Sequence, residues 1–383
     1  MSNNLLVFSD DWGRHPSSCQ HLVRQMLPRH RVLWVNTIGT RPPRFDLATV
    51  RRGLEKIRHW TRESSGEASL PAGLQISNPK MWPWFSSRFD RRLNRGLLKW
   101  QLKNRIGQDL VAPIAITTLP IVADLMDALP VRRWVYYCVD DFGDWPGLDG
   151  ETLRRLEAIV VKRADKLIAV SQNLKTRLEG MGRPAELLTH GVDLEFWSNP
   201  GHVKLPQLEN LEKPLVVFWG VIDRRLDMVW LKLLADRLSG TLVLTGPLAD
   251  PDPAIFQLPR TVRLGPLPFE DLPVLARAAA VLIMPYADLP VTRMIQPLKL
   301  KEYLMTGKPV VGRDLPATRE WNDCADVVPS AEEFVRAVLS RLNGLPEHQA
   351  KARARLQRES WTDKTRLFES WILEGDSALA ACG

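Results

Sequence analysis

Residues 5–35 read LLVFSDDWGRHPSSCQHLVRQMLPRHRVLWV, and their pattern decides the fold. Two short apolar runs, Leu5–Phe8 and Val32–Val35, are typical of buried strands. Between them, apolar side chains recur at helical spacing: Cys19, Leu22, Val23 and Met26. A strand, a helix and a strand within roughly 35 residues predict a βαβ unit, which belongs to a parallel sheet.

The same alternation continues along the chain. Strand-like apolar runs recur at residues 114–116, 134–139 and 167–170, and then at 215–219, 241–244, 262–264, 281–284 and 309–311. A polar stretch with several prolines separates the two series. We therefore predict an α/β protein with two Rossmann-like, doubly wound domains that face a central cleft.

The two series also predict the domain boundaries. We expect one domain at residues 1–196, a linker at 197–213 and a second domain at 214–346. Residues 347–383 form a basic and then amphipathic helical segment, which we expect to cross back over both domains. Two sheets whose strand ends face each other suit an enzyme with two substrates.

The composition is typical of a soluble globular protein, with 45% apolar and 25% charged residues in 383. Apolar runs are too short to span a bilayer, and the first one lacks the flanks of a signal peptide. The four cysteines are scattered, without paired or zinc-type spacing. We therefore expect a cytoplasmic protein with no structural metal and no cofactor.

The net charge of +8 is concentrated in residues 41–105. This stretch has fifteen Lys or Arg against five Asp or Glu, and it holds four tryptophans: Trp60, Trp82, Trp84 and Trp100. Cations and aromatic rings together are typical of surfaces that rest on anionic lipid headgroups. The alternatives are a plain solvated face and a nucleic-acid surface. We expect contact with an anionic membrane and no nucleic-acid partner.

Residues 297–312, PLKLKEYLMTGKPVVG, contain a Gly-Lys pair that suggests a phosphate-binding P-loop. A P-loop has Ser or Thr after its lysine, whereas Pro309 follows Lys308 here. The pattern instead predicts a helix over residues 297–305, with Gly307 as its C-terminal cap. Lys299 and Glu302 then lie one turn apart on one face. Such a pair can bind a nucleotide, or it can form an ordinary surface ion pair.

This block resembles the Pro-x-Lys-x-x-Glu-Tyr-Leu-x-x-Gly-Lys-Pro-Val-Val element of GT-B glycosyltransferases. That group includes glycosyltransferase family four and related bacterial polysaccharide-biosynthesis enzymes. Other segments resemble elements of the same group: Val170–Leu174, His190–Asp193 with Phe196, Gly265 with Leu272, and Met284–Tyr286. The resemblance spans nearly the whole chain and implies the GT-B fold with a nucleotide-sugar site.

By this resemblance, Lys299 would bind the diphosphate of a sugar donor and Glu302 its ribose. Gly220 would let the backbone approach the phosphates. Arg225, or else Arg224, would help to neutralise the charge that develops on the departing diphosphate, a task that needs cations when no metal is bound.

Three further residues are candidates for donor binding: Tyr286, Thr292 and Gln296. Met294 stands where many family-four enzymes have a second glutamate, eight residues before Glu302. Because this glutamate is missing, the resemblance leaves open whether the reaction retains or inverts the sugar's configuration.

Three carboxylates follow the predicted strand at 134–139: Asp140, Asp141 and Asp144. The carboxyl end of this strand faces the expected cleft, so one of them can accept the proton of an acceptor hydroxyl if the enzyme inverts. By similarity to related polysaccharide enzymes, Asp140 is the first choice. Helix capping and turn formation are the alternative roles.

The loop after the first strand, SDDWGRHPSSC at residues 9–19, also starts at the carboxyl end of a strand. Its candidate acceptor-binding residues are Trp12, Arg14 and His15, which alternatively belong to an ordered loop. His15 has no second ligand at a metal-binding spacing, so we predict no metal site.

The resemblance implies a metal-independent hexosyltransferase with a nucleoside-diphosphate sugar as donor, UDP being favoured over GDP. The first domain would bind a glycan acceptor, lipid-linked, in cell-surface polysaccharide biosynthesis, and the second the donor. The protein would be peripheral at the inner face of the plasma membrane. The alternatives are a GT-B nucleotide-sugar epimerase and a non-catalytic nucleotide-sugar-binding protein. A nicotinamide dehydrogenase is disfavoured because no Gly-x-Gly-x-x-Gly follows a predicted strand.

Overall fold

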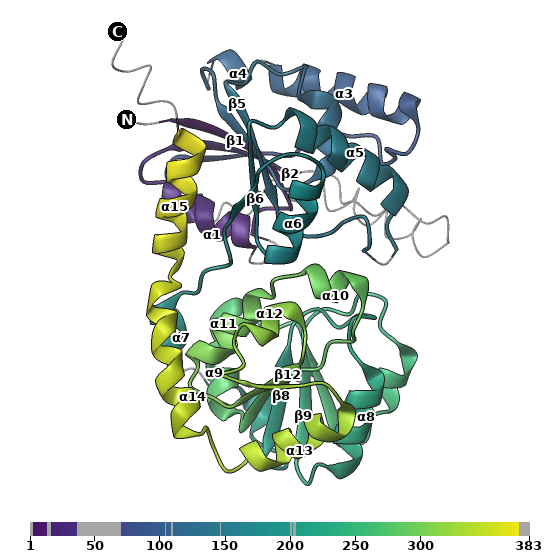
Figure 1. Cartoon of the computed structure of the whole chain (residues 1–383), viewed down its shortest axis with the longest axis vertical. Coiled ribbons are helices and arrows are strands. Elements are labelled where there is room, and N and C mark those ends of the chain that lie inside the picture. Colours follow the sequence, from purple (N-terminus) through teal and green to yellow (C-terminus); the bar gives the residue numbers. More distant parts are fainter. Residues whose placement is uncertain are drawn as a thin grey trace. The chain divides into compact units, whose positions relative to one another are not determined.

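The computed structural model describes residues 3–13, 17–36, 70–103, 105–108, 110–145, 147–199, 201 and 204–374. The chain forms two compact units, whose elements are labelled in Figure 1. Unit 1 comprises Met1–Leu188 and Thr365–Gly383, and unit 2 comprises Thr189–Lys364. The predicted site residues Arg14 and His15 lie outside the described residues, as does the part of the basic stretch at 41–69.

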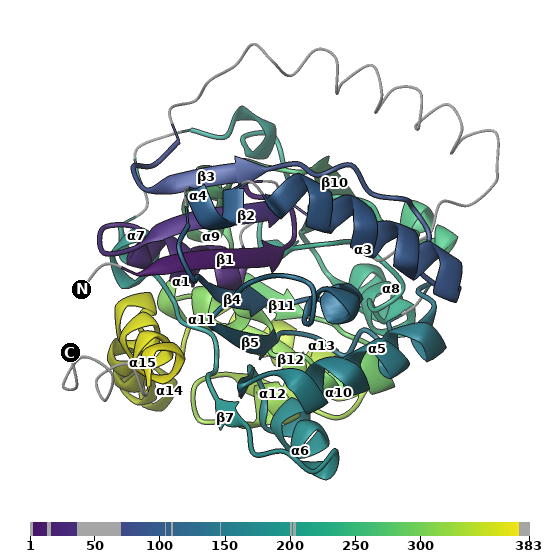
Figure 2. The same ribbon diagram turned by 90° about the horizontal axis from the view of Figure 1, so that it is seen from above.

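Unit 1 contains a parallel sheet in the order β3-β2-β1-β4-β5-β6-β7. Its strands are β1 (Asn4–Ser9), β2 (Arg31–Asn36), β3 (Leu74–Ser77), β4 (Ile114–Thr117), β5 (Arg133–Cys138), β6 (Lys166–Ala169) and β7 (Glu186–Leu187). Seen from above in Figure 2, β3 to β5 lie side by side. The chain reverses its direction of winding between β1 and β4, which is the switch point where such sheets bind ligands.

The helices of unit 1 are α1 (Ser18–Met26), α3 (Arg88–Lys103), α4 (Arg105–Gln108), η1 (Pro120–Leu125), α5 (Gly150–Arg163) and α6 (Gln172–Gly180). Figure 1 shows α5 and α6 on one side of the sheet and α1 on the other. Both faces of β1 are therefore covered, and Leu5, Leu6, Val7 and Phe8 are fully buried. This explains why the strand reads as a continuous apolar run.

Unit 2 repeats the architecture with a parallel sheet in the order β10-β9-β8-β11-β12-β13. Its strands are β8 (Leu215–Trp219), β9 (Thr241–Thr245), β10 (Thr261–Gly265), β11 (Val281–Met284), β12 (Val310–Arg313) and β13 (Asp326–Val328). The switch point here lies between β8 and β11, which pair in register at Val216 and Val217. Two doubly wound sheets confirm the predicted fold class.

The helices of unit 2 are α7 (Leu194–Ser198), η2 (Pro206–Leu208), α8 (Met228–Arg237), η3 (Pro253–Gln257), η4 (Phe269–Asp271), α9 (Leu272–Ala278), α10 (Pro290–Met294), α11 (Leu298–Met305), α12 (Pro316–Arg319), α13 (Ala331–Arg341), α14 (Glu347–Ala352) and η5 (Arg353–Arg358). Trp197, Leu205 and Leu208 are buried in the core of this unit. They come from the segment 197–213, which the sequence predicts to be a linker.

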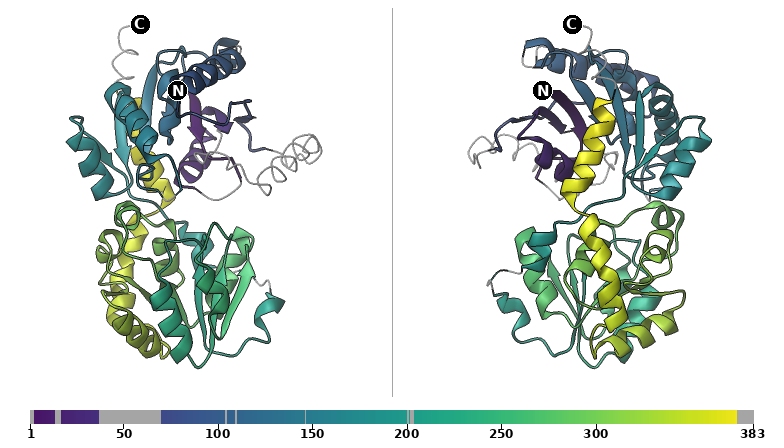
Figure 3. Two further views of the ribbon diagram at one scale, coloured as in Figure 1. Left: turned by 90° about the vertical axis from the view of Figure 1, so that its right-hand side faces the viewer. Right: turned by 60° about the vertical axis from the view of Figure 1, so that its left-hand side comes forward.

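The last helix, α15 (Trp361–Leu373), is the yellow helix nearest the C-terminus in Figure 3. Its residues up to Lys364 belong to unit 2 and those from Thr365 to unit 1. At its start, a Cβ on Gly191 would lie 2.7 Å from the Trp361 ring. Towards its end, Phe368 packs 5.3 Å from Tyr137 between ring centroids, and Glu369 accepts hydrogen bonds from the side chain of Arg29. The return of the C-terminal helix to the first unit was expected from the sequence.

No helix in the described parts of the chain is long and apolar enough to cross a membrane.

Candidate functional site: the switch point of unit 2

Helix α11 is fixed against the carboxyl end of β8 by one buried tyrosine. The Tyr303 hydroxyl accepts a hydrogen bond from the Trp219 backbone N–H at 2.9 Å and donates to the Trp219 carbonyl at 3.2 Å. The helix ends before Gly307, whose φ of +73° is the left-handed conformation of a helix C-terminal cap. This confirms the predicted role of Gly307 as the C-terminal cap. The contacts of Tyr303 with Trp219 bring one face of α11 to the switch point.

Lys299 lies over two aromatic rings at this switch point. Its Nζ is 4.6 Å from the centroid of Phe218 and 5.4 Å from that of Tyr286. Ring faces attract a cation, so they hold the ammonium in place without neutralising it. Gly220 follows β8 with φ of +142°, and a Cβ there would overlap Lys299 Nζ. The three predicted donor-binding residues Gly220, Tyr286 and Lys299 are thus brought together.

Glu302 lies one turn from Lys299 and is half-buried. Burial raises the pKa of its carboxyl to about 7, and the Lys299 ammonium and the Trp219 side chain partly oppose this rise. A carboxyl that titrates near neutrality without a full counter-charge is typical of functional sites. Sequence reasoning did not single out Trp219, although its position at the end of an apolar strand in a doubly wound domain is a usable signal.

The two predicted arginines have carboxylate partners. Arg225 is nearly buried and binds the Asp223 carboxylate, with its Nε 3.0 Å from both oxygens. Arg224 is exposed, and its Nε donates to Asp250 at 3.1 Å. The loop of Arg225 is joined to the loop after β11, because the Ala287 N–H donates to the Arg225 carbonyl at 2.7 Å. Arg225 is therefore the better fixed of the two.

Thr292 and Gln296 are both buried. The Thr292 hydroxyl accepts from the Leu289 N–H at 2.9 Å and donates to the Ala287 carbonyl at 2.6 Å, so it caps α10. The same turn recurs after β12, where Thr318 caps α12 in an identical pattern. Contacts of Thr292 and Gln296 with a sugar stay predictions.

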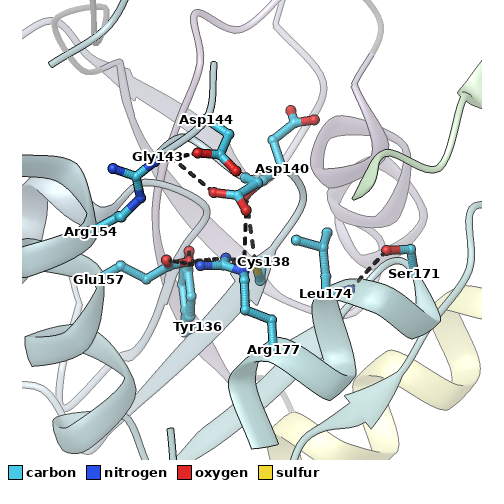
Figure 4. Close-up of polar contacts among 11 residues, drawn as sticks. Tyr136, Cys138, Asp140, Gly143, Asp144, Arg154, Glu157, Ser171, Leu174 and Arg177 are labelled. Carbon is cyan, nitrogen blue, oxygen red and sulfur yellow. Dashed lines mark hydrogen bonds and ion pairs between the residues drawn. The ribbon is translucent and has the colours of Figure 1, made fainter. Parts of the chain in front are cut away.

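In unit 1, a charge cluster of Glu157 and Arg177 lies next to the carboxylates that follow β5 (Figure 4). Glu157 on α5 accepts from both terminal nitrogens of Arg177 on α6, at 2.6 and 2.8 Å, and from the Tyr136 hydroxyl at 2.7 Å. Arg177 Nε also lies 3.5 Å from an Asp141 oxygen. Sequence reasoning missed Glu157 and Arg177, because they come from separate helices and belong to no recognisable motif.

The three predicted carboxylates have different surroundings. Asp141 is buried and accepts from the Gly143 N–H at 3.1 Å; burial raises its pKa, and Arg177 partly opposes the rise. Asp144 is exposed and forms an ion pair with Arg154. Asp140 is half-buried, and Figure 4 shows its carboxylate pointing away from the Arg154–Asp144 pair. All three occupy the carboxyl end of β5, as the sequence predicts.

The loop after β1 is held against α1 and β2. The Gln20 side chain donates to Asp10 and to the Asp11 carbonyl, both at 3.2 Å. The Trp12 N–H donates to Asn36 Oδ1 at 2.9 Å, and its ring packs edge-on against Trp34 at 4.8 Å. Trp12 is therefore part of an ordered loop at the ligand-binding edge of the sheet, and its role in acceptor binding stays a prediction.

Among the described residues, no group of three or more His, Cys, Asp or Glu side chains could hold a metal ion.

No family model matches the sequence. Over 178 residues, the chain is 30% identical to TuaH of Bacillus subtilis (strain 168), a protein assigned to teichuronic acid biosynthesis as a glycosyltransferase. The match covers 44% of this chain and 45% of TuaH, so it spans less than half the length of that relative.

Solved structures match almost the whole chain. Anabaena HepE in complex with UDP matches 97% of this chain and 99% of its own length, with a TM-score of 0.66 and 15% identity. Sucrose-phosphate synthase from Thermosynechococcus elongatus matches 98% of this chain and 100% of its own, with a TM-score of 0.72 and 14% identity. An E. coli trehalose-6-phosphate enzyme bound with UDP-2-fluoro glucose has a TM-score of 0.64 at 13% identity over 97% of this chain and 99% of its own. The chain therefore has the GT-B fold that its sequence blocks imply.

Proposed function

We propose that this protein is a glycosyltransferase that transfers a sugar from a UDP-sugar to a glycan acceptor. The observation that carries the proposal is the placement of Lys299, Gly220 and Glu302 at the switch point of unit 2. The Lys299 ammonium, held on ring faces beside the side-chain-free backbone of Gly220, can bind a diphosphate. The Glu302 carboxylate, one helical turn away, can accept hydrogen bonds from ribose hydroxyls. UDP is favoured over GDP because HepE and the E. coli enzyme were solved with UDP or a UDP-sugar.

Departure of UDP leaves negative charge on its outer phosphate. In the proposed reaction Lys299 and Arg225 stabilise that charge, in the manner of other preorganised cations at developing anions. Arg225 would exchange part of its contact with Asp223 for the phosphate. Tyr286, which is buried against Phe218, holds the Lys299 ammonium in position. The transfer needs no metal in this proposal, because side-chain cations take that role.

The acceptor would bind at the edge of the unit 1 sheet, where β1 and β5 end. One of the aspartates after β5 would accept the proton of the attacking hydroxyl, with Asp140 as the first choice. Burial raises the pKa of Asp141, and this direction supports a proton-accepting role in this loop, since a more basic carboxylate accepts a proton more readily. If Asp140→Asn, Asp141→Asn and Asp144→Asn each keep the wild-type transfer rate, the general-base proposal is wrong.

We further propose that the acceptor is lipid-linked, that the product enters a cell-surface polysaccharide, and that the protein works as a peripheral protein at the inner face of the plasma membrane. The similarity of part of the chain to TuaH supports a place in polysaccharide biosynthesis.

A nucleotide screen tests the donor half of the proposal. A ligand that binds only the folded state raises the melting temperature. We expect UDP to raise it more than GDP or ADP, and Lys299→Ala and Glu302→Gln to reduce the shift. Lys308→Ala is the matched control, because that lysine follows the helix cap and should not contact the donor. Release of UDP from a UDP-sugar only when a glycan acceptor is present separates a transferase from an epimerase and from a binding protein.

A further inference from the structure

Helix α3 of unit 1 presents one buried face and one exposed face of unusual composition. The buried positions are Asn94, Leu98 and Leu102. The exposed positions are Arg88, Phe89, Arg92, Arg95, Gly96, Lys99, Trp100 and Lys103. Every exposed side chain of the helix is therefore a cation or an aromatic ring, apart from one glycine.

The cations form a single row. Arg88, Arg92, Arg95, Lys99 and Lys103 follow each other at spacings of three or four residues, so they lie on one side of the helix. Asp90 is the one acidic residue in the helix sequence, and it is half-buried. Its carboxylate accepts hydrogen bonds from Ser87 and from the Trp82 indole. No exposed acidic residue of α3 therefore lies beside this row of cations.

Two aromatic rings stand beside this row. Phe89 is 71% exposed and Trp100 is 78% exposed, which is rare for side chains of this size. They are eleven residues apart, or three turns, so they point in directions only about 20° apart and roughly 16 Å separate them along the axis. The exposed face of α3 thus has cations along one side and two rings along the other.

The helix is held in place before any partner binds. Asn94 Nδ2 donates to the carbonyls of Trp82 and Trp84, at 3.0 and 2.9 Å, and its Oδ1 accepts from the Trp82 N–H at 2.7 Å. Arg91 forms an ion pair with Asp124 of η1, at 3.2 Å. Trp82 and Trp84 pack on each other with their centroids 4.8 Å apart. Of the described tryptophans in the basic stretch, Trp100 is the most exposed, at 78% against 39% for Trp82.

We propose that the exposed face of α3, defined by Phe89, Trp100 and the row of five cations, binds the surface of an anionic lipid bilayer. A preformed helix that lies in the plane of a membrane can insert two rings among the acyl chains and place its cations on headgroup phosphates. Rings and cations on the exposed face of one helix can contact a flat surface together, whereas a single-stranded nucleic acid is bound in a groove that combines cations with stacking rings. This deepens the proposed function, because a lipid-linked acceptor is presented at such a surface.

Vesicle flotation of the full chain tests the proposal. We expect binding to phosphatidylcholine vesicles that contain phosphatidylglycerol, weak binding to pure phosphatidylcholine, and loss of binding as salt rises. Phe89→Ser/Trp100→Ser and Arg92→Glu/Lys99→Glu should each weaken binding by about tenfold or more. Val229→Ser/Leu248→Ser removes two exposed apolar side chains in unit 2, and Lys232→Glu/Lys351→Glu makes the same change of net charge there. Both control variants should bind as the wild type does.

Wild-type vesicle binding by folded Phe89→Ser/Trp100→Ser would overturn the proposal, and so would equal losses in the control variants. Binding of single-stranded RNA that depends on Arg92 and Lys99, without vesicle binding, would also overturn it. The UDP-induced rise of melting temperature, measured on the same variants, keeps the two proposals apart. Vesicle binding without any response to UDP would contradict the glycosyltransferase proposal alone. A response to UDP without vesicle binding would contradict the membrane-surface proposal alone.

Discussion

The Lys299 ammonium occupies the space that a Cβ on Gly220 would need, 4.6 Å from the centroid of the Phe218 ring. The conformation of residue 220 and the position of this cation are therefore coupled. Two independent constraints require glycine at the end of β8: the positive φ of residue 220, and the Lys299 Nζ that a Cβ would overlap.

Gly220→Ala should displace Lys299 and strain the backbone. We expect a loss of about 1–3 kcal/mol in the free energy of unfolding, since a non-glycine residue at positive φ is strained. We also expect loss of the UDP-induced rise in melting temperature. Gly96→Ala is the control, because a Cβ there meets nothing within 4 Å and the residue lies within α3, where alanine is favoured. Urea unfolding measures both variants, and an unchanged UDP response in Gly220→Ala would contradict the coupling.

The carboxyl of Glu302 should make stability depend on pH. Its pKa is about 7 in the fold, against 4.5 for an ordinary glutamate, so the folded state holds a proton that the unfolded state loses between these values. The free energy of unfolding should therefore decrease as pH rises from about 4.5 to about 7, by on the order of 1–3 kcal/mol, and level off above that range. Glu302→Gln cannot titrate and should remove this decrease, whereas Glu347→Gln, at an exposed position, should keep it. Parallel pH dependences for wild type and Glu302→Gln in urea unfolding would show that this carboxyl is not the cause.

Lys301 lies on the same helix as Glu302, α11, and should stabilise unit 2. Its ammonium is buried and donates to the His190 carbonyl, to Glu359 and to Thr189 Oγ1, the last at 3.2 Å. Lys301→Met leaves the His190 carbonyl without this donor, whereas Glu359 and Thr189 Oγ1 keep Lys364, at 2.7 and 3.0 Å. We expect a loss of about 2–3 kcal/mol in unfolding free energy. Lys351→Met, which breaks an exposed pair with Glu347, should change it by less than about 1 kcal/mol. Equal effects of the two variants would rule out the buried cluster as a stabilising element.

Arg177 should be essential to the charge cluster of unit 1. Arg177→Met leaves Glu157 and Asp141 buried without their cation, and we expect a loss of about 3–5 kcal/mol. Replacing both partners of the closest pair, in Arg177→Met/Glu157→Leu, should recover much of this loss, because Glu157 is then no longer a buried charge without its cation, although Asp141 still lacks Arg177. Arg154→Met breaks only the exposed pair with Asp144 and should cost about 1 kcal/mol or less. A double variant that is no more stable than Arg177→Met would contradict this explanation.

The fold could be predicted where apolar periodicity was strong. The runs at 5–8, 32–35 and 215–219 became central strands because both of their faces are buried, which leaves a continuous apolar signature. Three edge elements were not predicted: β3, β7 and β13. They are short, and polar side chains occupy part of each, so little apolar pattern marks them. Helix α3 was also missed, because only three of its sixteen residues are buried.

The candidate sites divide in a similar way. Lys299 and Glu302 could be placed on one helix face because spacing along a helix fixes direction. The Glu157–Arg177 pair and the contacts of Lys301 join segments that are far apart in the sequence, and sequence spacing carries no information about such contacts. The pairing of Arg225 with Asp223 was missed for a different reason: the two residues are only two apart in the sequence, and their pairing depends on the conformation of the loop after β8.

The most direct test of the central claim is isothermal titration of UDP into the wild type, Lys299→Ala and Lys308→Ala. Loss of the diphosphate contact should weaken binding in Lys299→Ala by about tenfold or more, since a charge-assisted hydrogen bond is worth about 1.5–3 kcal/mol. Lys308→Ala should bind UDP as the wild type does. Equal UDP affinities in all three proteins, or no binding of UDP by the wild type, would contradict a nucleotide-sugar site at the switch point of unit 2.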